Sequence, residues 1–344
     1  MEKTGFDFGM HYFRAFAIFS VMTVHMWITP PVEGHEALSR FLDMLRGVLF
    51  HSSTLYFIFI SGYLFHFLSQ KGFDTLVYYR KKINNVIIPY LFLSVFFTVY
   101  ALVWNAYTGE VPRFARLASG FGEFFEALLY GNVVPTYWYI PFIATVFAAS
   151  PLLLRLDKRR FGLLTLFTVW IPLLIPRTEL TDFFHNYAFF FPLYLIGIFF
   201  SMNREAVLAF IAEHLRLFAA FAVLFTLVLA ADRYSPLLPN DEAAYYLQKL
   251  CIGACVIHGF ERIRHVRVAV LDLIARYSFA LYFLHDFILF TFQGTLFRVF
   301  GRVLPDSLFL VSLLTFGCEV ALCLLLGISV KKLFGARSRY LIGA

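Results

Sequence analysis

Ten apolar segments, each close to the length of a membrane-spanning helix, follow one another along this chain. A helix needs about 20 mostly apolar residues to cross the hydrocarbon core of a bilayer. Hydrophobic residues make up 60% of the 344 residues and the mean hydropathy is +0.74, which excludes an ordinary soluble domain. We therefore predict an all-α, polytopic membrane helix bundle of about ten transmembrane helices, forming a single domain over residues 1–344. The segments cover residues 11–29, 48–69, 86–106, 136–154, 160–176, 185–202, 215–232, 243–260, 277–297 and 307–330.

The distribution of Lys and Arg predicts the orientation of this bundle. With a cytoplasmic N-terminus, 19 of the 29 Lys and Arg residues fall on the cytoplasmic side and 8 on the opposite side, while Arg14 and Lys249 lie inside segments. An excess of basic residues in cytoplasmic loops is typical of membrane proteins. We therefore expect both termini in the cytoplasm. The net charge of +7 then reflects topology, and nucleic acid is not an expected partner.

The first segment carries two polar groups that are costly inside lipid, Arg14 and His25. At about 100° and 1.5 Å per residue, their spacing of eleven residues returns to nearly the same helix face about 16 Å further along. Ionisable groups at membrane depth usually face protein or water and have a function. This face is therefore the first candidate for a functional site.

Five short motifs then occur in order along the chain. They are RAFAIFSVMTVH (Arg14–His25), FIFISGYLF (Phe57–Phe65), YYRKKINNVIIPYL (Tyr78–Leu91), TYWYIPFI (Thr136–Ile143) and SFALYFLHDFIL (Ser278–Leu289). Together they resemble the motifs of the acyltransferase 3 family of integral membrane proteins, over most of the chain. Lys82 and Asn85 depart from the family pattern, which often has arginine at both positions. Lysine lacks the bidentate fork of arginine, and asparagine lacks the charge.

The resemblance implies transfer of an acyl group, acetyl or succinyl, from cytoplasmic acyl-CoA to a hydroxyl of an exported or cell-surface polysaccharide. It also implies a multi-pass protein of the bacterial inner membrane, with acyl-CoA as co-substrate donor and a polysaccharide or lipid-linked glycan as acceptor. Polysaccharide synthase components or a second copy of the chain are further expected partners. Two other functions stay open: an exporter of polysaccharide or lipid-linked sugar without acyl transfer, and a sensor or scaffold subunit of a synthase complex.

His25 is the candidate catalytic residue. A thioester is already an activated acyl donor, so the protein must supply a base, positioning and stabilisation of the oxyanion. Histidine suits the role of base because it titrates near neutral pH. His25 either deprotonates the sugar hydroxyl directly or is itself acylated and passes the group on. The alternative is a structural histidine that is hydrogen-bonded within the bundle.

The donor side is assigned to cationic groups near the cytoplasmic face. Arg14 is expected to hold phosphate or to orient the donor, and the alternative is a snorkelling anchor at the membrane interface. Arg80, Lys81 and Lys82 are expected to contact the phosphates of coenzyme A, although any cytoplasmic loop carries such residues. Ser61 offers a hydroxyl near the thioester, whereas the Ser61–Gly62 pair also favours close helix packing.

Acceptor contacts are expected from polar and aromatic side chains of other segments. Tyr137 and Trp138 form either a stacking platform for a sugar or an aromatic belt at the interface. The remaining candidates are His51, His285, Asp286 and Glu319. For His285, Asp286 and Glu319 the alternative is an internal hydrogen-bonded pair. No metal is expected, because the ten histidines lack the spacing of a ligand pair on one helix face and no carboxylate cluster accompanies them.

Overall fold

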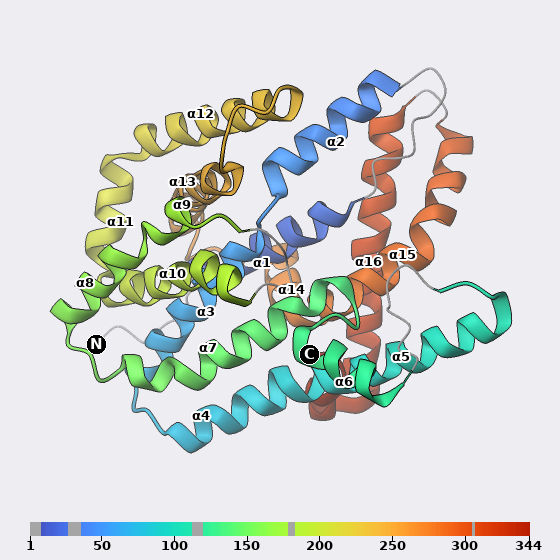
Figure 1. Ribbon diagram of the computed structural model, residues 1–344, viewed down its shortest axis with the longest axis horizontal. Coiled ribbons are helices and arrows are strands. Elements are labelled where there is room, and N and C mark those ends of the chain that lie inside the picture. The colour runs from blue at the N-terminus through green and yellow to red at the C-terminus, as the bar shows by residue number, and fades with distance from the viewer. Residues whose placement is uncertain (1–7, 27–35, 112–119, 178–182, 305–306) are drawn as a thin grey trace. The chain divides into compact units, whose positions relative to one another are not determined.

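The computed structural model describes residues 8–26, 36–111, 120–177, 183–304 and 307–344. Every regular element in these ranges is a helix or a helical turn (Figure 1), which confirms the predicted all-α fold. The elements are α1 (Phe8–His25), α2 (Glu36–Phe50), α3 (Thr54–Ser69), α4 (Thr75–Lys82), η1 (Ile83–Ile87), α5 (Ile88–Thr108), α6 (Phe121–Tyr130), η2 (Pro135–Trp138), α7 (Tyr139–Leu153), α8 (Lys158–Thr168), α9 (Ile171–Leu174), α10 (Phe183–Met202), α11 (Arg204–Glu213), α12 (Leu215–Tyr234), α13 (Asp241–Arg262), α14 (Ala269–Arg276), α15 (Ser278–Val303), α16 (Leu308–Phe334), η3 (Gly335–Arg337) and α17 (Ser338–Ile342).

Seven helical stretches of the described residues are long and apolar enough to cross a membrane. Each overlaps one of the predicted spans, so the polytopic membrane bundle is confirmed. The total of about ten spans and the cytoplasmic location of both termini stay predictions. The seven stretches are Glu36–Ser69, Thr75–Thr108, Pro135–Leu153, Phe184–Met202, Leu215–Tyr234, Ser278–Val303 and Phe309–Ile342.

Two further predicted spans correspond to single helices. Segment 11–29 forms α1, which ends at His25, and its residues 27–29 lie outside the described ranges. Segment 243–260 lies within α13, a helix of 22 residues. This helix is long enough to span a membrane, but Lys249 and the charged residues near its ends lower its hydropathy.

Prolines produce two local irregularities. Segment 160–176 is divided into α8 and α9, and Pro172 lies in the first turn of α9. A proline has no N–H and disrupts the preceding helical turn, so the segment is broken at this point. Pro89 follows the π-helical turn η1, in which the Ile88 N–H donates to the Ile83 carbonyl five residues back.

The chain divides into two compact units that alternate along the sequence. Unit 1 comprises Met1–Val24, Asp43–Phe73 and Leu152–Arg276, and unit 2 comprises His25–Leu42, Asp74–Pro151 and Tyr277–Ala344. Each unit combines segments that are far apart in the sequence.

Unit 1 is organised around the packing of α3 against α10. A Cβ atom built on Gly62 of α3 would lie 2.0 Å from the Tyr194 carbonyl oxygen, and one built on Gly197 of α10 would lie 2.0 Å from the Phe59 carbonyl oxygen. The two backbones therefore touch at two reciprocal glycines, as small residues allow in membrane helices. The interpretation of the Ser61–Gly62 pair as a packing element is confirmed for Gly62.

Unit 2 is built on α15 and α16, which pack side by side (Figure 1). The short helix α17 packs on α5, and the Phe287 ring of α15 contacts Phe97 and Tyr100 of α5 at ring-centroid distances of 5.5 and 5.7 Å. The turn η2 also packs on α15. Three of these elements, η2, α15 and α16, supply the polar groups described below.

Candidate active site

The helix α1 contains both Arg14 and His25 without interruption. The eleven-residue spacing therefore operates within one regular helix, as the sequence predicts. His25 is the last residue of α1, where orphan carbonyl groups and the negative end of the helix dipole favour a cationic side chain.

Three ionisable side chains of unit 2 converge at this helix end. The ligand atoms of His25, His285 and Asp286 all lie within 4.8 Å of one another, and the rings of the two histidines have a centroid distance of 5.4 Å. His285 and Asp286 of α15 are buried, with exposed fractions of 0% and 1%, respectively. The structure thus brings together the predicted base and two of the residues expected on the acceptor side. We call these three residues the His25 cluster.

A hydrogen bond to the backbone favours one tautomer of the His285 ring in the cluster. Its Nδ1 lies 2.7 Å from the Tyr282 carbonyl oxygen, and a carbonyl can only accept, so Nδ1 carries a hydrogen. In the neutral ring, Nε2 is then an acceptor. It lies 3.6 Å from Asp286 Oδ1, and both atoms are buried without a hydrogen-bond partner among the described residues. Two buried acceptors that face each other favour a proton or a hydroxyl donor between them.

The turn η2 holds Asp286 in place from the opposite side. Thr136 donates to Asp286 Oδ2 through its hydroxyl at 2.7 Å and its backbone N–H at 3.3 Å. In return, the Tyr282 hydroxyl donates to the Thr136 carbonyl, and the Tyr137 hydroxyl donates to the Phe283 carbonyl at 2.9 Å. Thr136 is a contact of this candidate site that the sequence pattern did not indicate. Its position beside the Tyr137–Trp138 motif was the available signal.

The geometry of the His25 cluster also matches a metal-binding donor set. Two imidazoles and one carboxylate leave an open position in many catalytic metal sites, and outer hydrogen bonds such as those of His285 Nδ1 and Asp286 Oδ2 orient metal ligands. Sequence spacing does not reveal this set, because His25 and His285 come from helices 260 residues apart. The donor set of the cluster therefore fits two kinds of chemistry, proton transfer and cation binding.

Arg14 is held by the short helix α14 within unit 1. Its Nε donates to the Ala275 carbonyl oxygen at 3.0 Å, and its Nη2 donates to the same oxygen. Ala275 is one residue from the C-terminus of α14, where carbonyl groups lack helical partners. These two hydrogen bonds use Nε and Nη2 and do not involve Nη1. Arg14 is thus both a helix cap and a candidate anion contact.

Additional contacts join α1 and α14. The His11 ring lies 3.1 Å from Asp272 Oδ1, and Tyr12 accepts from the Val268 N–H at 2.7 Å. Hydrogen bonds from Arg276 and then from His11 and Arg267 lower the pKa of Asp272 to about 2, so its carboxylate is ionised at neutral pH. This network fixes the direction of the Arg14 side chain.

The three basic residues at the end of α4 have different environments. Arg80 and Lys81 are exposed and available to an anion. Lys82 instead places its ammonium 3.6 Å from the centroid of the Phe147 ring and 5.4 Å from that of Tyr78. Such cation–π contacts stabilise a lysine that is withdrawn from water. Binding of phosphate by Lys82 would therefore compete with these two rings.

Among the predicted acceptor contacts, Tyr137 is fully buried and its hydroxyl is bound to the Phe283 carbonyl, and Trp138 follows it in η2. Glu319 of α16 is fully buried, and neither carboxyl oxygen has a hydrogen-bond partner in the described ranges. The helix α16 packs against α15, which carries His285 and Asp286, so Glu319 and these two residues lie on neighbouring helices of unit 2.

Besides Arg14, two predicted residues belong to unit 1. Ser61 is half-buried on α3. His51 Nε2 lies 2.8 Å from Glu242 Oε1, and the neighbouring Ser52 donates to Glu242 Oε2 at 3.1 Å. Lys249 donates to the Leu49 carbonyl at 2.8 Å. His51, Ser52 and Glu242 form a hydrogen-bonded set of their own.

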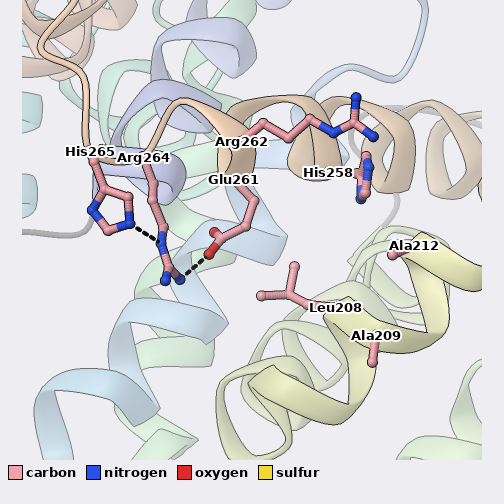
Figure 2. Close-up of a pocket in the computed structure, with 8 residues that line it drawn as sticks. All are labelled: Leu208, Ala209, Ala212, His258, Glu261, Arg262, Arg264 and His265. Atoms are coloured by element: carbon pink, nitrogen blue, oxygen red, sulfur yellow. Dashed lines mark hydrogen bonds and ion pairs between the residues drawn. The ribbon is translucent and has the colours of Figure 1, made fainter.

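Unit 1 also has a pocket of about 470 Å³ between α11 and α13 (Figure 2). Glu261 in this pocket accepts from Arg204 at 2.9 Å and from Arg264. Figure 2 shows the Arg262 side chain extending away from Glu261 and Arg264. Since Glu261 offsets the arginine charge and the carbonyl end of α13 disfavours anions, this pocket is a poorer phosphate site than Arg14. Its lining residues are Leu208, Ala209, Ala212, His258, Glu261, Arg262, Arg264 and His265.

Comparison with protein families gives one match, the acyltransferase domain of the acyltransferase 3 family, over residues 7–328. No curated protein and no solved structure matches the chain. The matched region contains α1 with Arg14 and His25, the turn η2 and the His285–Asp286 pair. The chain therefore belongs to the acyltransferase 3 family and is an integral membrane acyltransferase.

Proposed function

We propose that this protein is a membrane O-acyltransferase that moves an acetyl or succinyl group from cytoplasmic acyl-CoA to a hydroxyl of an exported or cell-surface polysaccharide. The observation that carries the proposal is the His25 cluster at the end of α1, with its ligand atoms within 4.8 Å of one another. Family membership supports acyl transfer. The proposed location is the bacterial inner membrane. A lipid-linked glycan is the alternative acceptor. The proposed protein partners are a polysaccharide synthase component or a second copy of the chain.

The proposed reaction needs a single base. The hydroxyl oxygen of the acceptor forms a bond to the thioester carbon while the hydroxyl proton moves to His25. The C–S bond then breaks, and the coenzyme A thiolate takes the proton from the His25 imidazolium. His285 and Asp286 are positioning residues in this scheme, because an adjacent carboxylate and ring acceptor orient and stabilise a protonated His25. In the alternative route, His25 is acylated first and then transfers the group to the hydroxyl.

The experiment that tests the function compares O-acyl groups on surface polysaccharide from cells with and without this protein. Acylated polymer from the first cells and unsubstituted polymer from the second support the enzyme. An exporter would instead leave polymer trapped inside the deleted cells, and the acyl content of the total polymer would be equal in both. A synthase scaffold would change the amount of polymer made.

Donor binding gives a second prediction, which concerns Arg14. Acetyl-CoA is expected to raise the Tm of the detergent-solubilised protein by mass action, and Arg14→Ala is expected to remove most of this shift. Because Arg14 also caps α14, the variant lowers the Tm without ligand as well, so the ligand-induced difference is the quantity to measure. Arg233→Ala is the matched control: it removes an arginine bonded to the Tyr245 hydroxyl and should keep the shift. Equal shifts in wild type and Arg14→Ala would contradict the donor contact.

Metal removal separates the two uses of the His25 cluster. We propose proton transfer without a metal, because the thioester needs no further activation. Dialysis of the purified protein against a strong chelator should therefore leave the transfer rate unchanged, with elemental analysis of the dialysed sample as the check that metal is gone. A loss of activity that zinc restores, together with about one bound metal per chain, would assign His25 as a metal ligand rather than a base.

A further inference from the structure

A row of buried polar groups follows the inward face of α16. Ser312, Thr315 and Glu319 are spaced by three and four residues and therefore share one face of the helix. Their exposed fractions are 1%, 2% and 0%, respectively. The hydroxyls of Ser312 and Thr315 and both carboxyl oxygens of Glu319 have no hydrogen-bond partner among the described residues. The His25 mechanism uses none of these three groups.

The helix α15, which packs on α16, adds similar groups. Gln293 is 8% exposed, and its Nε2 has no hydrogen-bond partner in the described part of the chain, like Asp286 Oδ1. Asp286 and Gln293 are seven residues apart and also share a helix face. Both faces are buried, and α15 is the helix against which α16 mainly packs, so the two faces meet. We call Ser312, Thr315, Glu319, Gln293 and Asp286 the polar seam.

Helix packing alone does not account for the polar seam. Polar side chains between membrane helices usually hydrogen-bond across the interface, and these atoms do not do so within the described ranges. A buried polar group without a partner costs free energy. Five such residues in two facing rows therefore weaken the packing of α15 against α16. A ligand that formed hydrogen bonds with these residues would lower the free-energy cost of separating the two helices along the polar seam.

The donors and acceptors of the polar seam define the ligand class. Gln293 Nε2 only donates, Asp286 Oδ1 accepts when ionised, and the Ser312 and Thr315 hydroxyls do both. An anion requires mainly donors and a metal ion requires mainly acceptors, so neither satisfies the whole set. A series of hydroxyl groups satisfies it, because each hydroxyl donates and accepts. The seam leads along α15 to Asp286 and hence to the His25 cluster.

We propose that the polar seam is the acceptor site, where the hydroxyl groups of a saccharide chain bind and reach His25. This inference rests on the proposed function for the identity of the acceptor. It assigns acceptor recognition to Ser312, Thr315 and Gln293, which have no part in the transfer step. Changes at these residues therefore affect acceptor binding and leave donor binding intact.

The test uses full-length protein in lipid nanodiscs, radiolabelled acetyl-CoA, and unsubstituted polysaccharide isolated from cells that produce His25→Ala. Ser312→Ala and Thr315→Val remove one hydroxyl each and nearly preserve volume, so they should fold. Each is expected to raise the KM for polysaccharide about three- to tenfold, as expected for one lost hydrogen bond, with the KM for acetyl-CoA unchanged. Tyr246→Phe is the matched control, since the Tyr246 hydroxyl of α13 is equally buried and also lacks a partner in the described residues. It should leave both KM values unchanged.

The outcomes distinguish this inference from the proposed function. If the wild type transfers the acyl group and both variants have an unchanged KM for polysaccharide, the polar seam is not the acceptor site. The proposed acyltransferase activity would then still stand. A similar rise in KM in Tyr246→Phe would also overturn the polar seam as the acceptor site, because the effect would then follow from lost buried hydroxyls in general. No transfer by the wild type would overturn the enzyme. In that case the Tm is measured with and without polysaccharide. If polysaccharide raises the Tm and Ser312→Ala and Thr315→Val reduce this rise, the polar seam is still a glycan site. If polysaccharide does not raise the Tm, both the polar seam and the proposed function are overturned.

Discussion

Replacement of His25 by alanine is expected to reduce acylation of the surface polysaccharide to background and to leave polymer export intact. A positioned general base contributes about 10²- to 10⁴-fold to a rate, and no other group of the His25 cluster occupies its place at the end of α1. The measurement is the O-acyl content of polysaccharide isolated from cells that produce either protein at equal membrane levels. Equal acyl content in wild type and variant would contradict the catalytic role.

A matched control for this experiment is His66→Ala. His66 is also a histidine within a membrane-spanning helix, α3, where its Nδ1 lies 2.9 Å from Ser201 Oγ. This variant removes a hydrogen bond of unit 1 and is expected to change stability modestly and acyl content little. If both histidine variants lose acylation to the same degree, the effect of His25→Ala is a loss of folding rather than of catalysis. Detergent-extracted yield and Tm of the two variants provide the comparison.

The two routes through His25 differ in what accumulates. An acyl-histidine intermediate predicts radiolabel on the protein after incubation with acetyl-CoA alone, and its loss in His25→Ala. Direct transfer predicts no labelled protein without acceptor. His285→Ala serves as the companion variant, since a positioning residue should slow transfer without carrying label itself. Label found on His285 instead would move the catalytic assignment to α15.

The helices could be predicted from the sequence because bilayer thickness fixes the length of an apolar span. The segment with Arg14 and His25 forms one helix, and Gly62 packs against a neighbouring backbone, both as expected. These features depend on neighbours along the chain. The count of about ten spans is a weaker inference, because α13 carries charged residues that length alone does not reveal.

Contacts between distant helices could not be predicted in the same way. Helical periodicity shows which face of α15 is buried, but not that His25 ends up beside His285, or that Thr136 holds Asp286. It also gives no sign that the guanidinium of Arg14 caps α14. The basic run at the end of α4 appeared uniform in sequence, yet Lys82 lies on the Phe147 ring while Arg80 is exposed. Tertiary packing separates residues that have the same chemistry.

The largest effect on stability is expected from Gly62→Ala. The added methyl group would lie 2.0 Å from the Tyr194 carbonyl oxygen and 2.9 Å from its carbonyl carbon, and backbone atoms cannot move aside as a flexible side chain can. The helices α3 and α10 must separate, and the packing of unit 1 is lost along their contact. Overpacking of a core costs about 1–3 kcal/mol or more, and we expect at least the upper end here. The measurement is the Tm and yield of the detergent-solubilised variant.

Two comparisons make this prediction specific. Gly259→Ala is the control, because a Cβ atom there meets nothing within 4 Å and alanine favours a helix interior over glycine, so its Tm should be unchanged or higher. Gly197→Ala should resemble Gly62→Ala, since its added methyl group would meet the Phe59 carbonyl at 2.0 Å. The double variant should then lose less stability than the sum of the two, because separation of α3 and α10 relieves both overlaps at once. A fully additive loss would mean that each helix adjusts locally, and a stable Gly62→Ala protein would contradict the close contact itself.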